Sequence, residues 1–500
     1  MKSQGQTSNQ EIIRSRFGAT LCSASLQEVE DGVWFLIREG ERRLLCVIAR
    51  PGSHLLNGFE GRSEEHAKGL ALKVCPTTSQ NCAALRRAIP SLRPTTLGLK
   101  ESFGFGDRLG MATPGHVRAL QGTFSGPRSR LITPIFAQQS VRENTRTGRT
   151  PQGVLDDATW GAFEGGWRGR VGADADHLKT LGDVEAFAQA GYSLFTIDPG
   201  EHVDRQAEFV TPGSLRAKIA TLPWSDLETS VEDLLKRYEG EKIDLGVREL
   251  RIEKDAIMSS AAKYGKAVVH VVRMARHIAS KNIQFELEIS VDETETPTSA
   301  LDHFYIASEL RRLGIRWVSL APRYVGSFEK AIDYRGDVSA LQTSLIEHAA
   351  IASQLGPYKL GLHSGSDKFT VYPLIHGATN GLVHVKTAGT SYMEGLRVIA
   401  STAPELFRRI ATLAIERFPE DRRSYHLSAE LTSMPALSTL DDAELSRLLG
   451  EDSPRQVLHV AFGSVLDAYG GELKAVLAAH LEEYYSVLER HFSRHLSFLV

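Results

Sequence analysis

The 500-residue sequence lacks the motifs of several large enzyme and binding classes. Only four cysteines are present, and none has CxxC spacing, which excludes a zinc finger. No Walker phosphate-binding motif and no serine nucleophile elbow occurs. The glycine-rich string at 104–110 has GxGxxxG spacing and does not open a helix, so the sequence does not predict dinucleotide binding.

Strong charge and long apolar runs are also missing. The net charge is −3 with both signs interleaved, so the sequence shows no basic surface for nucleic acid. With 42% hydrophobic and 24% charged residues, the composition is that of a globular protein without a membrane span. The first residues, MKSQGQTS, contain no apolar core segment, so we expect no secretory signal and a cytoplasmic location.

The length predicts two or three structural units, because a single compact core rarely grows this large. We expect a small N-terminal α+β unit at 1–95, a catalytic unit at 96–400 and a helical C-terminal extension at 401–500. Within the first unit, three short apolar runs predict an antiparallel meander at 20–24, 33–38 and 44–48.

The catalytic unit repeats the order strand, polar loop, helix. Eight apolar runs predict strands at 96–101, 131–138, 170–176, 193–198, 284–291, 316–321, 358–363 and 382–386. Helical patterns lie between most of them, including 183–190, 299–313 and 339–354. This alternation predicts a (β/α)8 TIM-like barrel, with a doubly wound open sheet as the alternative. Polar residues follow the apolar runs, which favours the barrel, since it gathers the carboxyl ends of all strands at one mouth.

The densest group of titratable residues follows the third run, in the string GADADHLK at 172–179. Asp176 and His177 would point to opposite faces of a regular strand, so both can serve one site only if the strand ends there. We interpret Asp176 as a catalytic base and Glu293, after the fifth run, as its partner on the opposite face. A solvated charged loop is the alternative for each segment.

Three histidines are candidate metal ligands, namely His177, His363 and His384. His363 ends the seventh run and His384 lies in the eighth, and adjacent strands are about 4.8 Å apart, so their imidazoles can reach one ion. His177 would approach from across the mouth, and Glu293 is a reserve ligand. A packed or hydrogen-bonded core histidine is the alternative for His363 and His384.

Candidate substrate-binding residues also follow the strands. They are Lys179, Arg323, Ser364, Lys368 and Lys386. Backbone amides of the segment after His363 can cradle an anion, an arginine can bind a carboxylate with two hydrogen bonds, and a lysine offers a point charge. Among the four basic residues, the sequence does not select the one that binds a substrate carboxylate.

After residue 388 the pattern becomes helical, with helices predicted at 392–399, 403–417, 441–449 and 474–498. In the last of these, His491 and His495 have i, i+4 spacing, which two metal ligands on a helix would need. Their neighbours Tyr484, Leu488 and Phe492 favour a packing face over a metal site.

Six strings in order along the chain resemble the tagaturonate epimerase family: GFGDRLGMATPGH (104–116), SVRENTRTGRTP (140–151), GADADHLK (172–179), SLAPRYV (319–325), HSGSDKF (363–369) and HVKTAGT (384–390). The resemblance implies an isomerase of hexuronate catabolism that interconverts D-tagaturonate and D-fructuronate. It also implies a divalent metal cation, for which zinc, nickel, manganese and iron remain open. The expected partner is a small keto-hexuronate, without nucleic acid or membrane, and assembly as a homo-oligomer is left open.

The two keto acids differ at a carbinol carbon β to the ketone, whose C–H bond the ketone does not acidify. A retro-aldol cleavage, rotation of the aldehyde and reclosure would invert that carbon, with a metal ion stabilising the enediolate. Direct proton removal at the carbinol carbon is the mechanistic alternative. Two other functions would use the same site: a metal-dependent sugar-acid aldolase or lyase, and a non-catalytic sugar-acid-binding protein.

Overall fold

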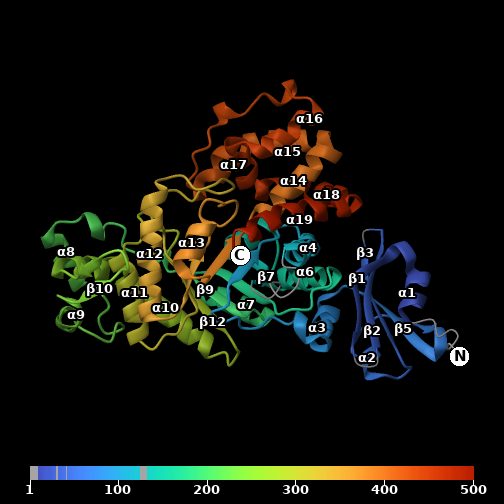
Figure 1. Cartoon of the computed structure of the whole chain (residues 1–500), viewed down its shortest axis with the longest axis horizontal. Coiled ribbons are helices and arrows are strands. Elements are labelled where there is room, and N and C mark those ends of the chain that lie inside the picture. The colour runs from blue at the N-terminus through green and yellow to red at the C-terminus, as the bar shows by residue number, and fades with distance from the viewer. Residues whose placement is uncertain (1–8, 30–31, 41, 124–131, 500) are drawn as a thin grey trace.

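The structure is a computed structural model that describes residues 9–29, 32–40, 42–123 and 132–499 (Figure 1). Eight parallel strands form a closed barrel in the order β12-β13-β14-β15-β6-β7-β8-β9. They are β6 (Ser102–Phe105), β7 (Thr133–Ser140), β8 (Gly172–Leu178), β9 (Leu194–Ile197), β12 (Glu286–Ser290), β13 (Ser319–Ala321), β14 (Lys359–Leu362) and β15 (Val383–Thr387). The last strand, β15, pairs with the first, β6, so the predicted barrel is confirmed and an open sheet is excluded.

Seven of the predicted strands overlap observed ones, and the first does not. The run at 96–101 precedes β6, because Gly98 takes a φ of 61° and turns the chain. The backbone amides of Leu97 and Gly98 donate to the Glu286 carboxylate, which holds this turn at the amino end of the barrel. The prediction was wrong because an apolar run does not show whether its residues pair with a strand.

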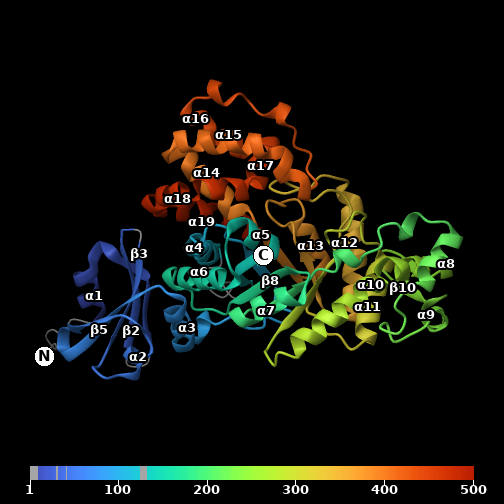
Figure 2. The same cartoon turned by 180° about the vertical axis from the view of Figure 1, so that it is seen from behind.

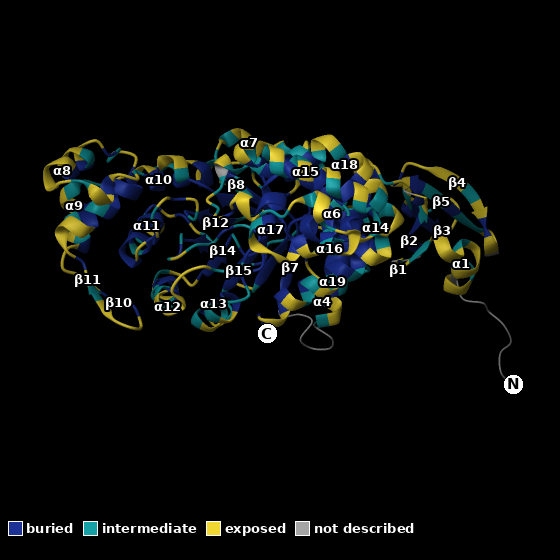
Figure 3. Cartoon of the chain, turned by 90° about the horizontal axis from the view of Figure 1, so that it is seen from above, coloured by how far each residue is buried: buried dark blue, intermediate teal, exposed yellow. Residues whose placement is uncertain are grey.

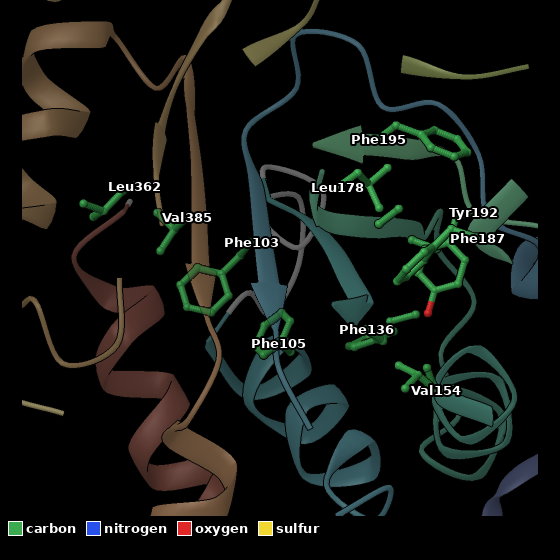
Figure 4. Close-up of a cluster of buried hydrophobic side chains, with 14 of the residues drawn as sticks. Phe103, Phe105, Phe136, Val154, Leu178, Phe187, Tyr192, Phe195, Leu362 and Val385 are labelled. Carbon is green, nitrogen blue, oxygen red and sulfur yellow. The ribbon is translucent and has the colours of Figure 1, made fainter. Parts of the chain in front are cut away.

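Helices surround the strands and confirm the three predicted ones. They are α4 (Thr113–Thr123), α5 (Val141–Thr147), α6 (Pro151–Glu164), α7 (Leu181–Ala190), α10 (Lys254–Ala279), α11 (Ala300–Arg312), α12 (Val338–Leu355) and α13 (Tyr372–Thr379). The side chains of Phe105, Phe136 and Val154 lie in the apolar layer between strands and helices (Figure 4). Figure 3 shows that buried residues run through the barrel, whereas the outer faces of the helices are exposed.

Two additions flank the barrel at opposite ends of the long axis (Figure 2). Between β9 and β12 lies an insertion with α8 (Pro212–Ala220), α9 (Val231–Tyr238), β10 (Lys242–Asp244) and β11 (Glu249–Arg251). At the other end, an antiparallel sheet has the order β1-β2-β3-β5-β4. Its strands are β1 (Leu21–Val29), β2 (Gly32–Glu39), β3 (Arg42–Ala49), β4 (Arg62–His66) and β5 (Leu70–Pro76), so β1 to β3 confirm the predicted meander.

The C-terminal region is helical, as predicted. It contains α14 (Thr390–Thr402), α15 (Pro404–Asp421), α16 (Asp442–Leu445), α17 (Asp452–Val460), α18 (Phe462–Ala479) and α19 (Leu481–Ser497). The single helix predicted at 474–498 is two helices, because the chain leaves helical geometry at His480 (φ −121°, ψ 34°). Phe492 of α19 packs on Phe105 and His116, so the last helix lies against the barrel. Among the described residues, no helix is both long and apolar enough to cross a bilayer.

Candidate active site

A backbone irregularity in β8 brings two neighbouring side chains into one site. His177 has a φ of 53°, in the left-handed region, and the pairing of β8 with β9 shifts register between Ala175 and Leu178. Because the bulge rotates one residue relative to the strand period, His177 Nε2 lies 3.8 Å from Asp176 Oδ1. The strand ends at Leu178, one residue after His177, so the bulge lies at the strand end that the sequence suggested.

His363 completes a group at the barrel mouth. It follows β14, and its ring centroid lies 5.2 Å from that of His177, with the two rings at 82°. One potential ligand atom from each of Asp176, His177 and His363 lies within 4.8 Å of the other two. The sequence placed β8 and β14 on opposite sides of the barrel, and their side chains nevertheless meet at its mouth.

Two buried carboxylates orient the imidazoles. His177 Nδ1 lies 3.1 Å from Asp198 Oδ2, and His363 Nε2 lies 2.9 Å from Glu288 Oε2. Such partners hold a ligand histidine in one tautomer and one orientation. Burial by itself would lower the pKa of His177, but Asp176 and Glu293 outweigh it and raise that pKa to about 10. The sequence assigned no role to Asp198 or Glu288, although both lie within predicted strands.

The structure does not bring His384 into the group at the mouth. His384 lies deeper in the barrel, with Nδ1 3.0 Å from Ser102 Oγ and Nε2 3.8 Å from Asp174 Oδ2. It forms a separate group with Asp174 and Glu288. The Lys386 ammonium contacts those two carboxylates at 2.7 and 2.6 Å and the Asp176 carboxylate at 2.8 Å, so it lies between the His384 group and the group at the mouth. We therefore leave His384 out of the ligand set.

The two acids predicted for proton transfer differ in their surroundings. Asp176 is buried, and its oxygens accept hydrogen bonds from Lys386 at 2.8 Å and Gln138 at 3.0 Å. Burial opposes ionisation of Asp176, but Lys386 and the neighbouring histidines hold its pKa below the ordinary value. Glu293 instead lines a cavity and is held by Arg142 at 2.8 Å.

That cavity, of about 180 Å³, opens beyond the carboxyl ends of β12, β13 and β14. Asp292, Glu293 and His363 form one part of its lining. Tyr425 and His426 of the C-terminal region also line it. The sequence carries no sign of these two residues, because no local pattern shows that the segment after α15 returns to the barrel mouth.

The predicted substrate-binding residues divide into two groups. Arg323 and Ser364 line the cavity. Lys179 does not, and its ammonium lies 3.7 Å from Asp198 and 3.3 Å from Glu201 at the rim.

The other two predicted lysines, Lys368 and Lys386, bind groups of the protein, which corrects their assignment to substrate binding. Lys368 is fully buried, and its ammonium donates to the backbone carbonyls of Glu329, Ile332 and Ser366, so it holds loops together. Lys386 points into the barrel, where three carboxylates surround its ammonium. Neither side chain has a donor left for a substrate.

Comparisons with known proteins show the family to which the chain belongs. A family model described as tagaturonate epimerase matches residues 22–499. The tagaturonate/fructuronate epimerase of Thermotoga maritima is 39% identical over 500 residues, which cover 98% of this chain and 99% of that protein. Two structures of fructuronate-tagaturonate epimerase UxaE from Cohnella laeviribosi, one native and one with a single glycerol, are 33% identical with a TM-score of 0.89. The native structure covers 98% of this chain and the glycerol complex covers 97%. In both comparisons 98% of the solved chain is matched. The chain therefore belongs to the tagaturonate epimerase family and is an isomerase-type enzyme.

Proposed function

We propose that this enzyme interconverts D-tagaturonate and D-fructuronate with a divalent metal ion held by Asp176, His177 and His363. The observation that carries the proposal is the meeting of these three donors at the mouth of a barrel of this family. Two imidazoles and one carboxylate suit divalent first-row metals such as zinc, nickel, manganese and iron. The hydrogen bond from His177 to Asp198 leaves Nε2 directed toward Asp176, as a ligand histidine requires.

A bound ion would stabilise negative charge that develops on the ketone oxygen of the substrate. The protein supplies the base. We assign that role to Glu293, because its carboxylate lines the cavity next to His363 and its position is held by Arg142. Asp176, the base expected from the sequence, is buried and already accepts two hydrogen bonds, so it serves better as a ligand.

The retro-aldol route conserves atoms and electrons. Glu293 removes the proton from the hydroxyl on the carbinol carbon β to the ketone. The bond between that carbon and its neighbour breaks, its electron pair passes to an enediolate, and the hydroxyl oxygen becomes an aldehyde oxygen. Rotation of the aldehyde exposes its other face, the carbon–carbon bond re-forms, and Glu293 returns the proton to the new alkoxide.

The first experiment measures products. Metal-free protein is reconstituted with each of the four ions and incubated with D-fructuronate. Formation of D-tagaturonate supports the proposal, whereas free three-carbon products would show an aldolase or lyase. No turnover with any of the ions would contradict it.

The mechanism is tested in D₂O. The retro-aldol route keeps the hydrogen on the inverted carbon, because no bond to that hydrogen breaks. Direct proton removal would replace it with deuterium, which mass spectrometry or NMR of the product would show. The cytoplasmic location, the homo-oligomer and the boundaries at 95 and 400 stay predictions.

A further inference from the structure

Lys330, in the loop after β13, lines the cavity close to Ser364. Its ammonium donates to Ser364 Oγ at 3.0 Å. Among the described residues, no carboxylate oxygen lies within 4.0 Å of this ammonium. A partly buried ammonium with only a hydroxyl partner has donors available to an anion.

Ser364 provides a second donor at the same place. Because its oxygen accepts the hydrogen bond from Lys330, its own O–H is free to donate into the cavity. Ser364 also directly follows His363, one of the three proposed metal ligands. A ligand that reaches from His363 along this wall therefore meets Lys330 and Ser364 together.

The backbone that carries Lys330 is held by the C-terminal region. The Glu329 carboxylate accepts hydrogen bonds at 2.7 Å from the backbone amide of Ser428 and at 2.7 Å from Gln456 Nε2. These buried contacts hold the neighbouring Lys330 in place before any ligand arrives. A preorganised donor loses less conformational entropy on binding.

Arg323 is the other side-chain cation in the lining for which no carboxylate partner appears within 4.0 Å among the described residues. Its Nη1 donates to the Thr294 carbonyl at 2.6 Å, and its backbone amide donates to Thr298 Oγ1 at 3.1 Å. These bonds join Arg323 to the loop that carries Glu293. The position of Arg323 thus favours a role in supporting the loop that carries Asp292 and Glu293.

We propose that Lys330 and Ser364 form the subsite for the substrate's carboxylate, and that Lys330 gives the enzyme its preference for sugar acids over neutral sugars. This inference rests on the proposed function, in which the substrate is a keto-hexuronate. The ammonium and the hydroxyl would bind the two oxygens of the carboxylate. His363 and Glu293 would then face the ketone and carbinol part of the same molecule.

The experiment compares Lys330→Met with Lys242→Met, which removes an exposed lysine on β10 in the insertion. Each protein is tested with D-fructuronate and with its neutral analogue D-fructose, in which a hydroxymethyl group replaces the carboxylate. Loss of a hydrogen bond to a charged group predicts that Lys330→Met raises KM for D-fructuronate by about 10- to 100-fold. We expect Lys330→Met to keep its metal content and its KM for D-fructose. Lys330→Arg should partly restore the KM for D-fructuronate, and Lys242→Met should have no effect.

Calorimetry of D-fructuronate binding separates this inference from the proposed reaction, because it needs no turnover. Binding by the wild type that Lys330→Met weakens supports the subsite even if no epimer forms. Equal binding by the wild type and Lys330→Met would overturn it. If Lys330→Met weakens the binding of D-fructose and D-fructuronate equally, Lys330 has only a structural role and the inference is overturned. If Arg323→Met loses the preference for the acid and Lys330→Met does not, the carboxylate subsite lies at Arg323.

Discussion

Lys386 donates a hydrogen bond of 2.8 Å to the buried Asp176 carboxylate, whereas Glu293 lines the cavity and pairs with Arg142 at 2.8 Å. The ammonium keeps the Asp176 carboxylate ionised and oriented toward the two histidines. The two acids that the sequence assigned to proton transfer thus have different surroundings, and their amide variants are expected to lose different properties.

Asp176→Asn is expected to lose bound metal and activity together, because an amide is a poorer ligand for a transition metal and leaves Lys386 with one fewer negative partner. Glu293→Gln is expected to retain metal and to lower kcat by about 100- to 10,000-fold, the usual contribution of a general base. Elemental analysis and steady-state kinetics measure both. A metal-free Glu293→Gln protein would return Glu293 to the ligand set.

His363→Ala is expected to lose metal and activity, since it removes one of three donors. His384→Gln is the matched control, because His384 lies with Asp174 and Glu288 and has Lys386 beside it. We expect this control to keep its metal content. Loss of metal in His384→Gln with retention in His363→Ala would reverse the ligand assignment.

His116 is expected to make the protein less stable in acid. It is buried, Ser391 Oγ lies 2.8 Å from its Nε2, and Nδ1 has no hydrogen-bond partner among the described residues. Ser391 donates its own proton to the Gly106 carbonyl, so its oxygen accepts from the His116 ring and Nε2 carries a proton. Burial lowers the pKa of His116 to about 4, from 6.5.

Between these two pKa values the unfolded chain binds more protons than the folded one, so stability falls as pH decreases from about 6.5 to 4. The loss attributable to this ring approaches about 3 kcal/mol at the lower limit. Urea unfolding at pH 7 and pH 5 compares the wild type with His116→Gln, whose amide can still donate to Ser391. The variant should lose less stability over this interval, and an equal loss in both would contradict the prediction.

Asp367 is expected to hold the loop after His363 against the C-terminal helices. Its carboxylate lies 2.8 Å from Arg455 and 2.8 Å from His491, and its backbone amide donates to His495. Each of the three side chains is therefore already bonded, although one potential ligand atom from each of Asp367, His491 and His495 also lies within 4.8 Å of the other two. Asp367 has a φ of 60°, which asparagine also tolerates, so Asp367→Asn removes charge with little backbone strain.

Leaving Arg455 buried without its partner should cost about 3 kcal/mol of unfolding free energy. Asp452→Asn is the control, because its ion pair with Arg335 is exposed, and it should cost less than about 1 kcal/mol. Denaturant titration measures both. Equal stability of Asp367→Asn and the wild type would remove Asp367 from this structural role.

The sequence by itself determined the alternation of strands and helices and favoured a barrel over an open sheet, since apolar runs and helical patterns are local features that short-range packing and hydrogen bonding impose. It also placed His177, His363 and Glu293 at or just after the ends of strands, where a barrel collects its chemistry. The six ordered strings pointed to the family that the comparisons then showed.

The tertiary structure alone decided which of these side chains meet. Local periodicity places Asp176 and His177 on opposite faces, and only the left-handed residue in the bulge of β8 turns both toward His363. Lys330 and His426 belong to loops without regular pattern, and their positions depend on a C-terminal region that folds back over the mouth. Such contacts depend on barrel closure and on packing between residues far apart in the chain, for which the local sequence carries no signal.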